Sequence, residues 1–190
     1  VIQAPSEGES QASELAKLKD VYAVASQDYD CLLFGAPRLI QNLTLARKRK
    51  TVSGVVDIKP ELIELESVIN FLGIDRDRLI ALGILAGTDY NIGGIKGIGQ
   101  KKALKIVQEY KSPVEIFKQF PDLDFDWKEI FELFKKPDVD KNVKIIFPKI
   151  NPDKIKEILS NRDFSEERID NQISKLFGAK GKSSQKTLFW

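Results

Sequence analysis

Helical stretches alternate with short apolar runs over the first third of the chain, and this pattern restricts the fold class more than any other feature. Good helix formers span residues 6–19, and the apolar run at residues 21–25 follows them as a predicted buried strand. A second short strand is predicted over residues 55–58, with Pro60 suited to the first turn of the next helix. Such alternation is typical of an α/β domain with a central, mostly parallel sheet.

Helical patterns dominate the rest of the chain. From residue 75 onward, after the alternating part, apolar residues recur at the helical period of about 3.6 residues. A Lys-, Gly- and Ser-rich segment from residue 178 onward predicts a flexible basic tail. We therefore expect the end of an α/β sheet domain followed by a helical extension. The predicted helices span residues 75–86, 100–110, 114–120, 127–134, 152–159 and 165–177.

The chain contains no histidine, which excludes several classes of catalytic site. Ser-His and Cys-His nucleophile pairs and His-rich zinc sites all need that residue. A bound metal would therefore be held by oxygen, as Mg²⁺, Mn²⁺ and Ca²⁺ prefer. The single cysteine, Cys31, excludes an intramolecular disulfide and fits a reducing interior. No apolar run has membrane-spanning length, no signal peptide is recognisable, and we do not expect Val1 to be the natural start.

Two aspartates follow the first predicted strand. If the backbone stays extended there, Asp28 and Asp30 project to the same side and could contact one ion. The carboxyl end of a strand is also where open α/β sheets bind ligands. An ordinary acidic turn is the alternative.

Three further acids lie at helix ends. Glu7 and Glu9 open the first predicted helix, and only at its very end could both serve one site, since residues two apart point to opposite sides. Ser6 and Glu9 also have the spacing of a capping box, a purely structural alternative. Asp89 ends an apolar helix, where an anion is disfavoured and needs a cation or donors nearby.

A glycine-rich segment joins two predicted helices at residues 93–99, and Lys101 and Lys102 open the second helix. Small residues let backbone N–H groups approach a phosphate, and the helix N-terminus adds a favourable dipole. The segment therefore predicts a grip on duplex DNA. A nucleotide-binding loop is disfavoured because no strand precedes it and no Gly-Lys-Ser/Thr occurs, and a plain helix connector is the other alternative. The net charge is only +2, which does not by itself indicate nucleic-acid binding. The clustering of basic residues, for example at residues 47–50, is the better indicator.

Five short strings, taken together and in this order, resemble the flap endonuclease branch of the XPG/Rad2-like structure-specific 5′ nucleases, with an archaeal character. The resemblance spans residues 1 to about 176. The strings are Ala4-Pro5-Ser6-Glu7-Gly8-Glu9, Ser26-Gln27-Asp28-Tyr29-Asp30, Gly87-Thr88-Asp89-Tyr90, Gly94-Ile95-Lys96-Gly97-Ile98-Gly99 and Phe164-Ser165-Glu166-Glu167-Arg168.

The resemblance implies a two-metal nuclease that cuts 5′ flaps on branched DNA during replication and repair. It implies two Mg²⁺ ions, or Mn²⁺ in their place, and a K⁺ ion held by backbone carbonyls near Ile95 and Ile98. Two alternatives remain: a non-catalytic fragment that binds DNA and a sliding clamp, or a sister 5′ exonuclease. The implied metal ligands and catalytic residues are Glu7, Glu9, Asp28, Asp30 and Asp89. The implied DNA-binding residues are Gly94, Lys96, Gly97, Gly99, Lys101 and Lys102.

The family pattern also sets the expected domains. Residues 1–88 would form the C-terminal part of a PIN-like α/β nuclease domain, residues 89–177 a helix–two turns–helix element with its helical extension, and residues 178–190 the tail. The family's N-terminal portion, with further metal-binding aspartates, is missing from this sequence, so we expect a weakened metal site. The resemblance implies a cytoplasmic protein, or a nuclear one in a eukaryote. Four tail residues resemble a sliding-clamp-binding motif whose aromatic pair arrives two residues early: Gln185, Leu188, Phe189 and Trp190.

Overall fold

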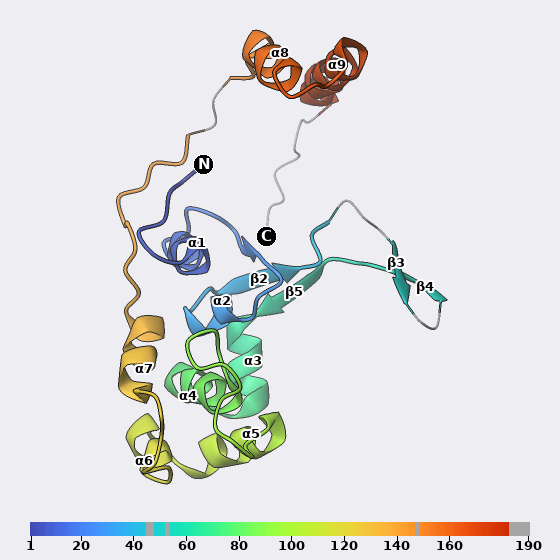
Figure 1. The fold of residues 1–190 in the computed structure, drawn as a ribbon. Helices are drawn as coiled ribbons and strands as arrows, with labels where there is room; N and C mark the ends of the chain where they lie inside the picture. Colours follow the sequence, from blue (N-terminus) through green and yellow to red (C-terminus); the bar gives the residue numbers. More distant parts are fainter. Residues whose placement is uncertain (45–47, 52–53, 147–148, 183–190) are drawn as a thin grey trace. The chain divides into compact units, whose positions relative to one another are not determined.

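The computed structural model describes residues 1–44, 48–51, 54–146 and 149–182 (Figure 1). The chain divides into two compact units, Val1–Lys144 and Ile145–Trp190. The predicted domain boundary after residue 88 falls inside the first unit. Among the described residues, no helix is long and apolar enough to cross a membrane.

A three-stranded sheet in the order β1-β2-β5 lies at the centre of the α/β part. Strand β1 (Val24–Ala25) pairs parallel with β2 (Arg38–Gln41), and β5 (Glu61–Glu64) pairs antiparallel with β2. The α/β class is therefore confirmed, in a small sheet with one parallel and one antiparallel pair. Because β1 and β2 run in the same direction, the residues that follow both strands lie at the same end of the sheet.

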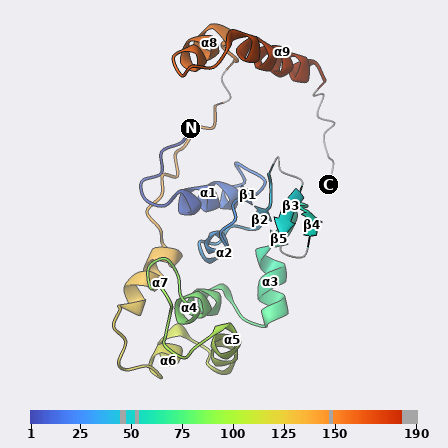
Figure 2. The ribbon, with the colours of Figure 1, turned by 45° about the vertical axis from the view of Figure 1, so that its right-hand side comes forward.

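Two helices pack beside this sheet. Helix α1 (Gly8–Lys17) contacts β1, and the single-turn helix α2 (Asp30–Leu33) contacts α1 and β2 (Figure 2). Their apolar side chains bury a small core with the strands. Its buried members are Ala16, Val24, Cys31, Leu32, Ala36 and Leu39. This core fixes the start of α2 relative to α1, and four of the five predicted acids lie at or next to those two helix starts.

Two predicted elements were wrong in part. The expected strand over residues 21–25 is reduced to Val24–Ala25, because the chain turns after α1, with Lys19 at a φ of 65°. The helix expected from Pro60 begins only at Leu65, as α3 (Leu65–Leu72), and residues 61–64 form β5 instead. Pairing with β2, in which Ile63 lies opposite the fully buried Leu39, outweighs the helical pattern.

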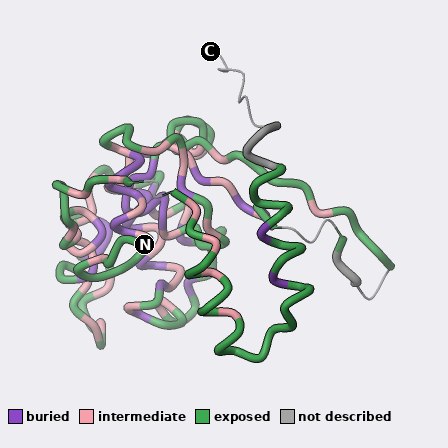
Figure 3. The backbone as a smooth tube through the Cα atoms, turned by 90° about the horizontal axis from the view of Figure 1, so that it is seen from above, coloured by how far each residue is buried: buried purple, intermediate pink, exposed green. Residues whose placement is uncertain are grey.

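In the chain between β2 and β5, strands β3 (Lys48–Thr51) and β4 (Gly54–Asp57) form a separate antiparallel hairpin (Figure 1). The predicted strand over residues 55–58 is therefore confirmed, one residue earlier. The whole of β4 is exposed, so this strand adds little to the core (Figure 3).

Helices α4 to α7 form the larger core of the first unit. The buried helix α4 (Arg76–Ala86) contacts α2, α5 (Gln100–Glu109), α6 (Pro113–Phe117) and α7 (Trp127–Lys135). All four were predicted, with α6 shorter than expected. Side-chain caps help to define three starts: Asp75 for α4, Ser112 for α6 and Asp126 for α7. The largest fully buried core residues are Phe34, Ile80, Ile84, Leu85, Ile116 and Phe134.

The second unit contains α8 (Pro152–Ser160) and α9 (Glu166–Lys182), which pack on each other. Ile169 and Ile173 are its buried apolar residues, and most of the unit is exposed (Figure 3). Helix α9 continues beyond the predicted end at residue 177, so residues 178–182 are helical and the predicted flexible tail does not begin at residue 178. The predicted clamp-binding residues, Gln185, Leu188, Phe189 and Trp190, lie outside the described residues.

Candidate metal centre and nucleic-acid interface

One cleft of about 190 Å³ brings together all five acids that the sequence predicted as metal ligands. The acids come from the start of α1, from the segment between β1 and α2, and from the turn after α4. We call this cleft, with its two aromatic residues, the acidic cleft. Its lining residues are Glu7, Glu9, Asp28, Asp30, Phe34, Asp89 and Tyr90.

Glu7 and Glu9 reach the cleft because α1 begins there. Glu7 is the N-cap residue, but its side chain caps no backbone N–H, so the capping box predicted from Ser6 and Glu9 does not define this helix start. The Glu7 carboxylate instead accepts a hydrogen bond from the Tyr90 hydroxyl, 3.0 Å from its Oε1. Glu9 lies in the first turn of α1, where the helix dipole stabilises a negative charge.

Asp28 and Asp30 line the cleft from a turn and a helix start, whereas the sequence predicted an extended strand. The backbone between them is not extended: Tyr29 has a φ of −75° and a ψ of −12°, and Asp30 is the first residue of α2. The expected same-side projection from a strand was therefore wrong, because β1 ends at Ala25 and a helix starts five residues later. The Asp28 backbone N–H donates to Ser26 Oγ at 3.1 Å, which fixes the connecting turn.

Asp89 is held in place by a buried polar group that the sequence did not single out. The Asn91 side chain accepts from the Thr88 hydroxyl at 2.7 Å and donates to the Ile84 carbonyl oxygen at 2.6 Å. Thr88 Oγ1 in turn accepts from the Tyr90 backbone N–H at 3.3 Å. These bonds close the turn at the end of α4 and so fix the backbone on both sides of Asp89. An asparagine directly after Gly87-Thr88-Asp89-Tyr90 was the available signal.

The electrostatics of the cleft favour a cation. Burial, together with repulsion from the other four acids, raises the pKa of Asp30 from 3.8 to about 6, and burial is the larger cause. None of the residues lining the cleft is Lys or Arg. Oxygen ligands of this kind suit Mg²⁺, Mn²⁺ or Ca²⁺, so the donor chemistry fits a divalent ion.

The cleft has the oxygen donors that a divalent ion needs, but its acids are not yet arranged around a single ion position. Across residues 1–182 without the undescribed gaps, no three Asp, Glu, Cys or His side chains lie close enough together to form a ready-made metal-binding group. The acids surround one space without converging on a point. Mutual repulsion disfavours the close approach of carboxylates when no cation lies between them.

The predicted DNA-binding segment forms a tight double turn between α4 and α5. Gly93, Gly94 and Gly97 all have positive φ, of 84°, 61° and 79°. Gly94 is required for a second reason, because a Cβ there would collide with the backbone at the end of α4. Ile95 N–H donates to the Leu85 carbonyl oxygen at 3.0 Å, which ties the turn to α4.

The second helix of this element presents its N-terminus and its lysines to solvent. Gly99 is the N-cap of α5 and offers no side-chain cap, so the first N–H groups of the helix remain available to a phosphate. Lys96, Lys101 and Lys102 are exposed, and Lys102 Nζ reaches the Gly97 carbonyl oxygen at 3.5 Å.

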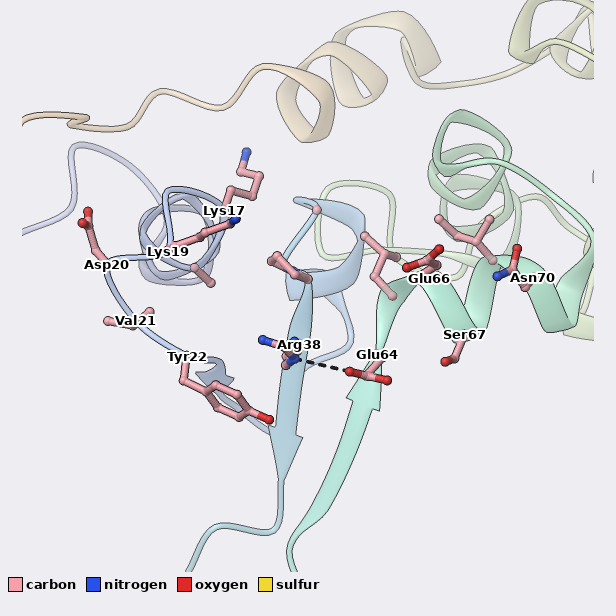
Figure 4. Close-up of a pocket in the computed structure, with 15 residues that line it drawn as sticks. Lys17, Lys19, Asp20, Val21, Tyr22, Arg38, Glu64, Glu66, Ser67 and Asn70 are labelled. Atoms are coloured by element: carbon pink, nitrogen blue, oxygen red, sulfur yellow. Dashed lines mark hydrogen bonds and ion pairs between the residues drawn. The ribbon is translucent and has the colours of Figure 1, made fainter. Parts of the chain in front are cut away.

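A larger cleft of about 880 Å³ lies elsewhere, lined by residues that precede β1, by the start of β2 and by the start of α3 (Figure 4). Arg38 stacks over the Tyr22 ring, 4.7 Å from its centroid, and pairs with Glu64 at 3.3 Å. Both members of the ion pair are substantially exposed, so the pair contributes at most about 1 kcal/mol. The cleft carries lysines and acids in mixture and none of the predicted ligands.

Comparison with known proteins identifies related sequences and folds. Residues 1–89 match the family model of the XPG I-region. Flap endonuclease 1 of Pyrococcus furiosus is 49% identical, in a match that covers 99% of this chain and 56% of that protein. The structure of flap endonuclease-1 from Methanococcus jannaschii is 40% identical with a TM-score of 0.78, and covers 93% of this chain and 52% of its own.

A more distant structure shares the fold and was determined with nucleic acid. The catalytic core of Rad2 in complex with DNA substrate is 25% identical with a TM-score of 0.71, and the match covers 90% of this chain and 62% of that one. The present chain spans about half the length of the curated relatives it matches.

Proposed function

We propose that this chain belongs to the flap endonuclease family, and that it carries the carboxylate metal site and part of the duplex-DNA grip of a structure-specific 5′ flap endonuclease. The observation that carries the proposal is the gathering of five acids around one cleft without a basic residue. An uncompensated carboxylate cluster is costly to fold and is found where cations bind.

The proposed reaction is hydrolysis of a phosphodiester bond in branched DNA. Bound Mg²⁺ or Mn²⁺ ions supply Lewis-acid stabilisation of the phosphate and a nucleophile at neutral pH. Glu7, Glu9, Asp28, Asp30 and Asp89 hold these ions, and each must be deprotonated to do so. No histidine base is needed, because the carboxylates act by positioning charge.

The glycine turn at residues 93–99 and the start of α5 hold the duplex. Backbone N–H groups at this helix N-terminus and the lysines at positions 96, 101 and 102 contact phosphates, which fixes the position of the DNA without reading its sequence. Backbone carbonyls near Ile95 and Ile98 are the proposed K⁺ ligands. Binding of a sliding clamp by the tail and a role in replication and repair remain predictions from the family resemblance.

A flap-cleavage assay tests the proposal. Wild type, Asp28→Ala, Asp30→Ala and the exposed control Asp122→Ala are compared on a 5′-flap duplex, with Mg²⁺ and with EDTA. The same set is made in a chimera that adds the N-terminal portion of the Pyrococcus furiosus relative. In the chimera we expect Mg²⁺-dependent cleavage, which Asp28→Ala and Asp30→Ala abolish and Asp122→Ala retains. If Asp30→Ala cleaves as well as wild type does, the metal assignment is contradicted.

One observation favours the second candidate, a non-catalytic DNA-binding fragment. The acids of this chain do not converge into a metal-binding group by themselves. If the chain alone binds the flap duplex without cutting it, while the chimera cuts in a way that depends on Asp30, the fragment binds DNA and needs further residues for catalysis.

A further inference from the structure

Tyr90 connects two parts of the acidic cleft that are 83 residues apart in the chain. Its hydroxyl donates to Glu7 Oε1 at 3.0 Å, and its ring lies in the same cleft beside Asp89. The hydroxyl therefore contacts one proposed metal ligand, while the backbone of Tyr90 directly follows another.

The Tyr90 ring is fixed by a buried aromatic group. It meets Phe134 edge to face, with centroids 5.5 Å apart and planes at 84°. Phe134 is fully buried and contacts Phe34, another cleft residue, at 4.8 Å between centroids. The Phe134 carbonyl oxygen accepts from Arg76, which also donates to the Leu33 carbonyl oxygen. These contacts join α7, α4 and α2, so the hydroxyl is presented from a rigid base.

Glu7 needs such a constraint more than the other acids do. It is exposed at the N-cap of α1 and has three rotatable side-chain bonds. A free side chain of this kind loses entropy when it is fixed to a ligand, and a partner that already holds it reduces that cost. The hydrogen bond occupies Oε1 and leaves Oε2 for a further contact.

The chemical type of the donor also matters. A lysine in this place would hold Glu7 equally well but would neutralise its charge and compete with a cation. A phenol donates a hydrogen bond and leaves the carboxylate negative. An ordinary phenol has a pKa of about 10, so it keeps its proton at neutral pH.

We propose that Tyr90 is a positioning residue that orients Glu7 for a divalent cation in the acidic cleft. The inference rests on the proposed function, since it assigns Tyr90 to the same metal site. Hydrogen-bond partners of metal ligands fix ligand orientation, and their loss typically weakens metal binding by about 10- to 100-fold. Because Glu7 is only one of five ligands, we expect the lower end of that range.

The test is Mn²⁺ binding by the full chain, measured by isothermal titration calorimetry. Tyr90→Phe removes the hydroxyl and keeps the ring on Phe134, and Tyr110→Phe is the matched control outside the cleft. We expect Tyr90→Phe to weaken Mn²⁺ binding about tenfold, with little change in the thermal midpoint in EDTA. Tyr110→Phe should bind as wild type does.

A double substitution shows whether the hydroxyl acts through Glu7. In a Glu7→Gln background, Tyr90→Phe should have little further effect on Mn²⁺ affinity. A full effect in that background, or wild-type affinity of Tyr90→Phe alone, overturns the positioning role. If wild type binds no Mn²⁺, or if Glu7→Gln and Asp30→Ala both bind as wild type does, the proposed metal site itself fails. The two failures are therefore distinguishable.

Discussion

Replacing Asp30 by asparagine should stabilise the metal-free chain at neutral pH, although it removes a proposed metal ligand. The reason is the crowding of acids in the cleft. Burial and, to a smaller extent, the charges of Asp28, Asp89, Glu9 and Glu7 together raise the pKa of Asp30 to about 6. The charged form of Asp30 is therefore a cost to the folded chain, and asparagine keeps the neutral form at every pH.

The sign and size follow from the two pKa values. The folded pKa lies above the ordinary value of 3.8, so the folded chain binds this proton more tightly than the unfolded chain does. The stability that protonated Asp30 gives to the folded wild-type chain is fully present below pH 3.8 and is lost as the pH rises through about 6. At 1.36 kcal/mol per pKa unit, the upper limit is about 3 kcal/mol. Asp30 is only partly buried, so solvent screening reduces the expected gain to about 1–2 kcal/mol.

Urea unfolding in EDTA measures this gain at about pH 7.5 and again at about pH 5, where wild-type Asp30 is largely protonated. We expect Asp30→Asn to be more stable than wild type at the higher pH and to gain only about half as much at the lower one, where the folded chain keeps the proton but the unfolded chain, with a pKa of 3.8, still loses it. The exposed Asp122→Asn serves as the control and should change neither value. Saturating Mg²⁺ should reverse the order, because a bound ion stabilises only the variant that retains its ligands. A gain that is independent of pH, or a loss of stability at pH 7.5, would refute the electrostatic reasoning.

Three further predictions test the turn after α4 and the DNA grip. Gly94→Ala should cost at least about 2 kcal/mol of unfolding free energy, since a Cβ collides with the α4 backbone, while Gly99→Ala, with open space around it, should cost much less. Asn91→Ala should cost about 2–3 kcal/mol in the same urea experiment, because it leaves buried groups without partners. Lys101→Ala combined with Lys102→Ala should weaken duplex binding for all sequences and lower the slope of log K against log salt by about 2, measured by fluorescence anisotropy; an unchanged slope would exclude phosphate contacts by these lysines.

Local signals were sufficient for the helical part of the fold. Asp75 marks the start of α4 as a side-chain cap, and the glycines before residue 100 mark the start of α5, so both helices lie where the sequence predicts them. Residues 61–64 were predicted wrongly because their strand depends on β2, whose paired residues lie 20 to 26 positions earlier in the chain. A pattern of apolar residues in a short segment fits a helix or a strand, and only the pairing partner decides.

The site shows the same division between local and long-range information. Each acid had a reasonable structural explanation in its own segment, and family order singled out the five together. Tyr90 and Asn91 were left out of the predicted site, because their importance depends on partners that no local pattern identifies. The Tyr90 hydroxyl finds Glu7 across 83 residues, and the Asn91 side chain reaches back to the end of α4.

The turn that follows α4 links the proposed metal site to the proposed DNA grip. Gly87 and Gly94 approach so closely that neither tolerates a Cβ, and between them lie Asp89, Tyr90 and Asn91. A shift of the glycine turn at residues 93–99 therefore moves the backbone of a proposed ligand and of its neighbouring positioning residue. Substitutions inside this turn should alter DNA binding and Mn²⁺ binding together, whereas the lysines of α5, which project to solvent, should alter DNA binding alone. In the proposed function, one short stretch of backbone thus sets both the position of the duplex and the geometry of the metal ligands.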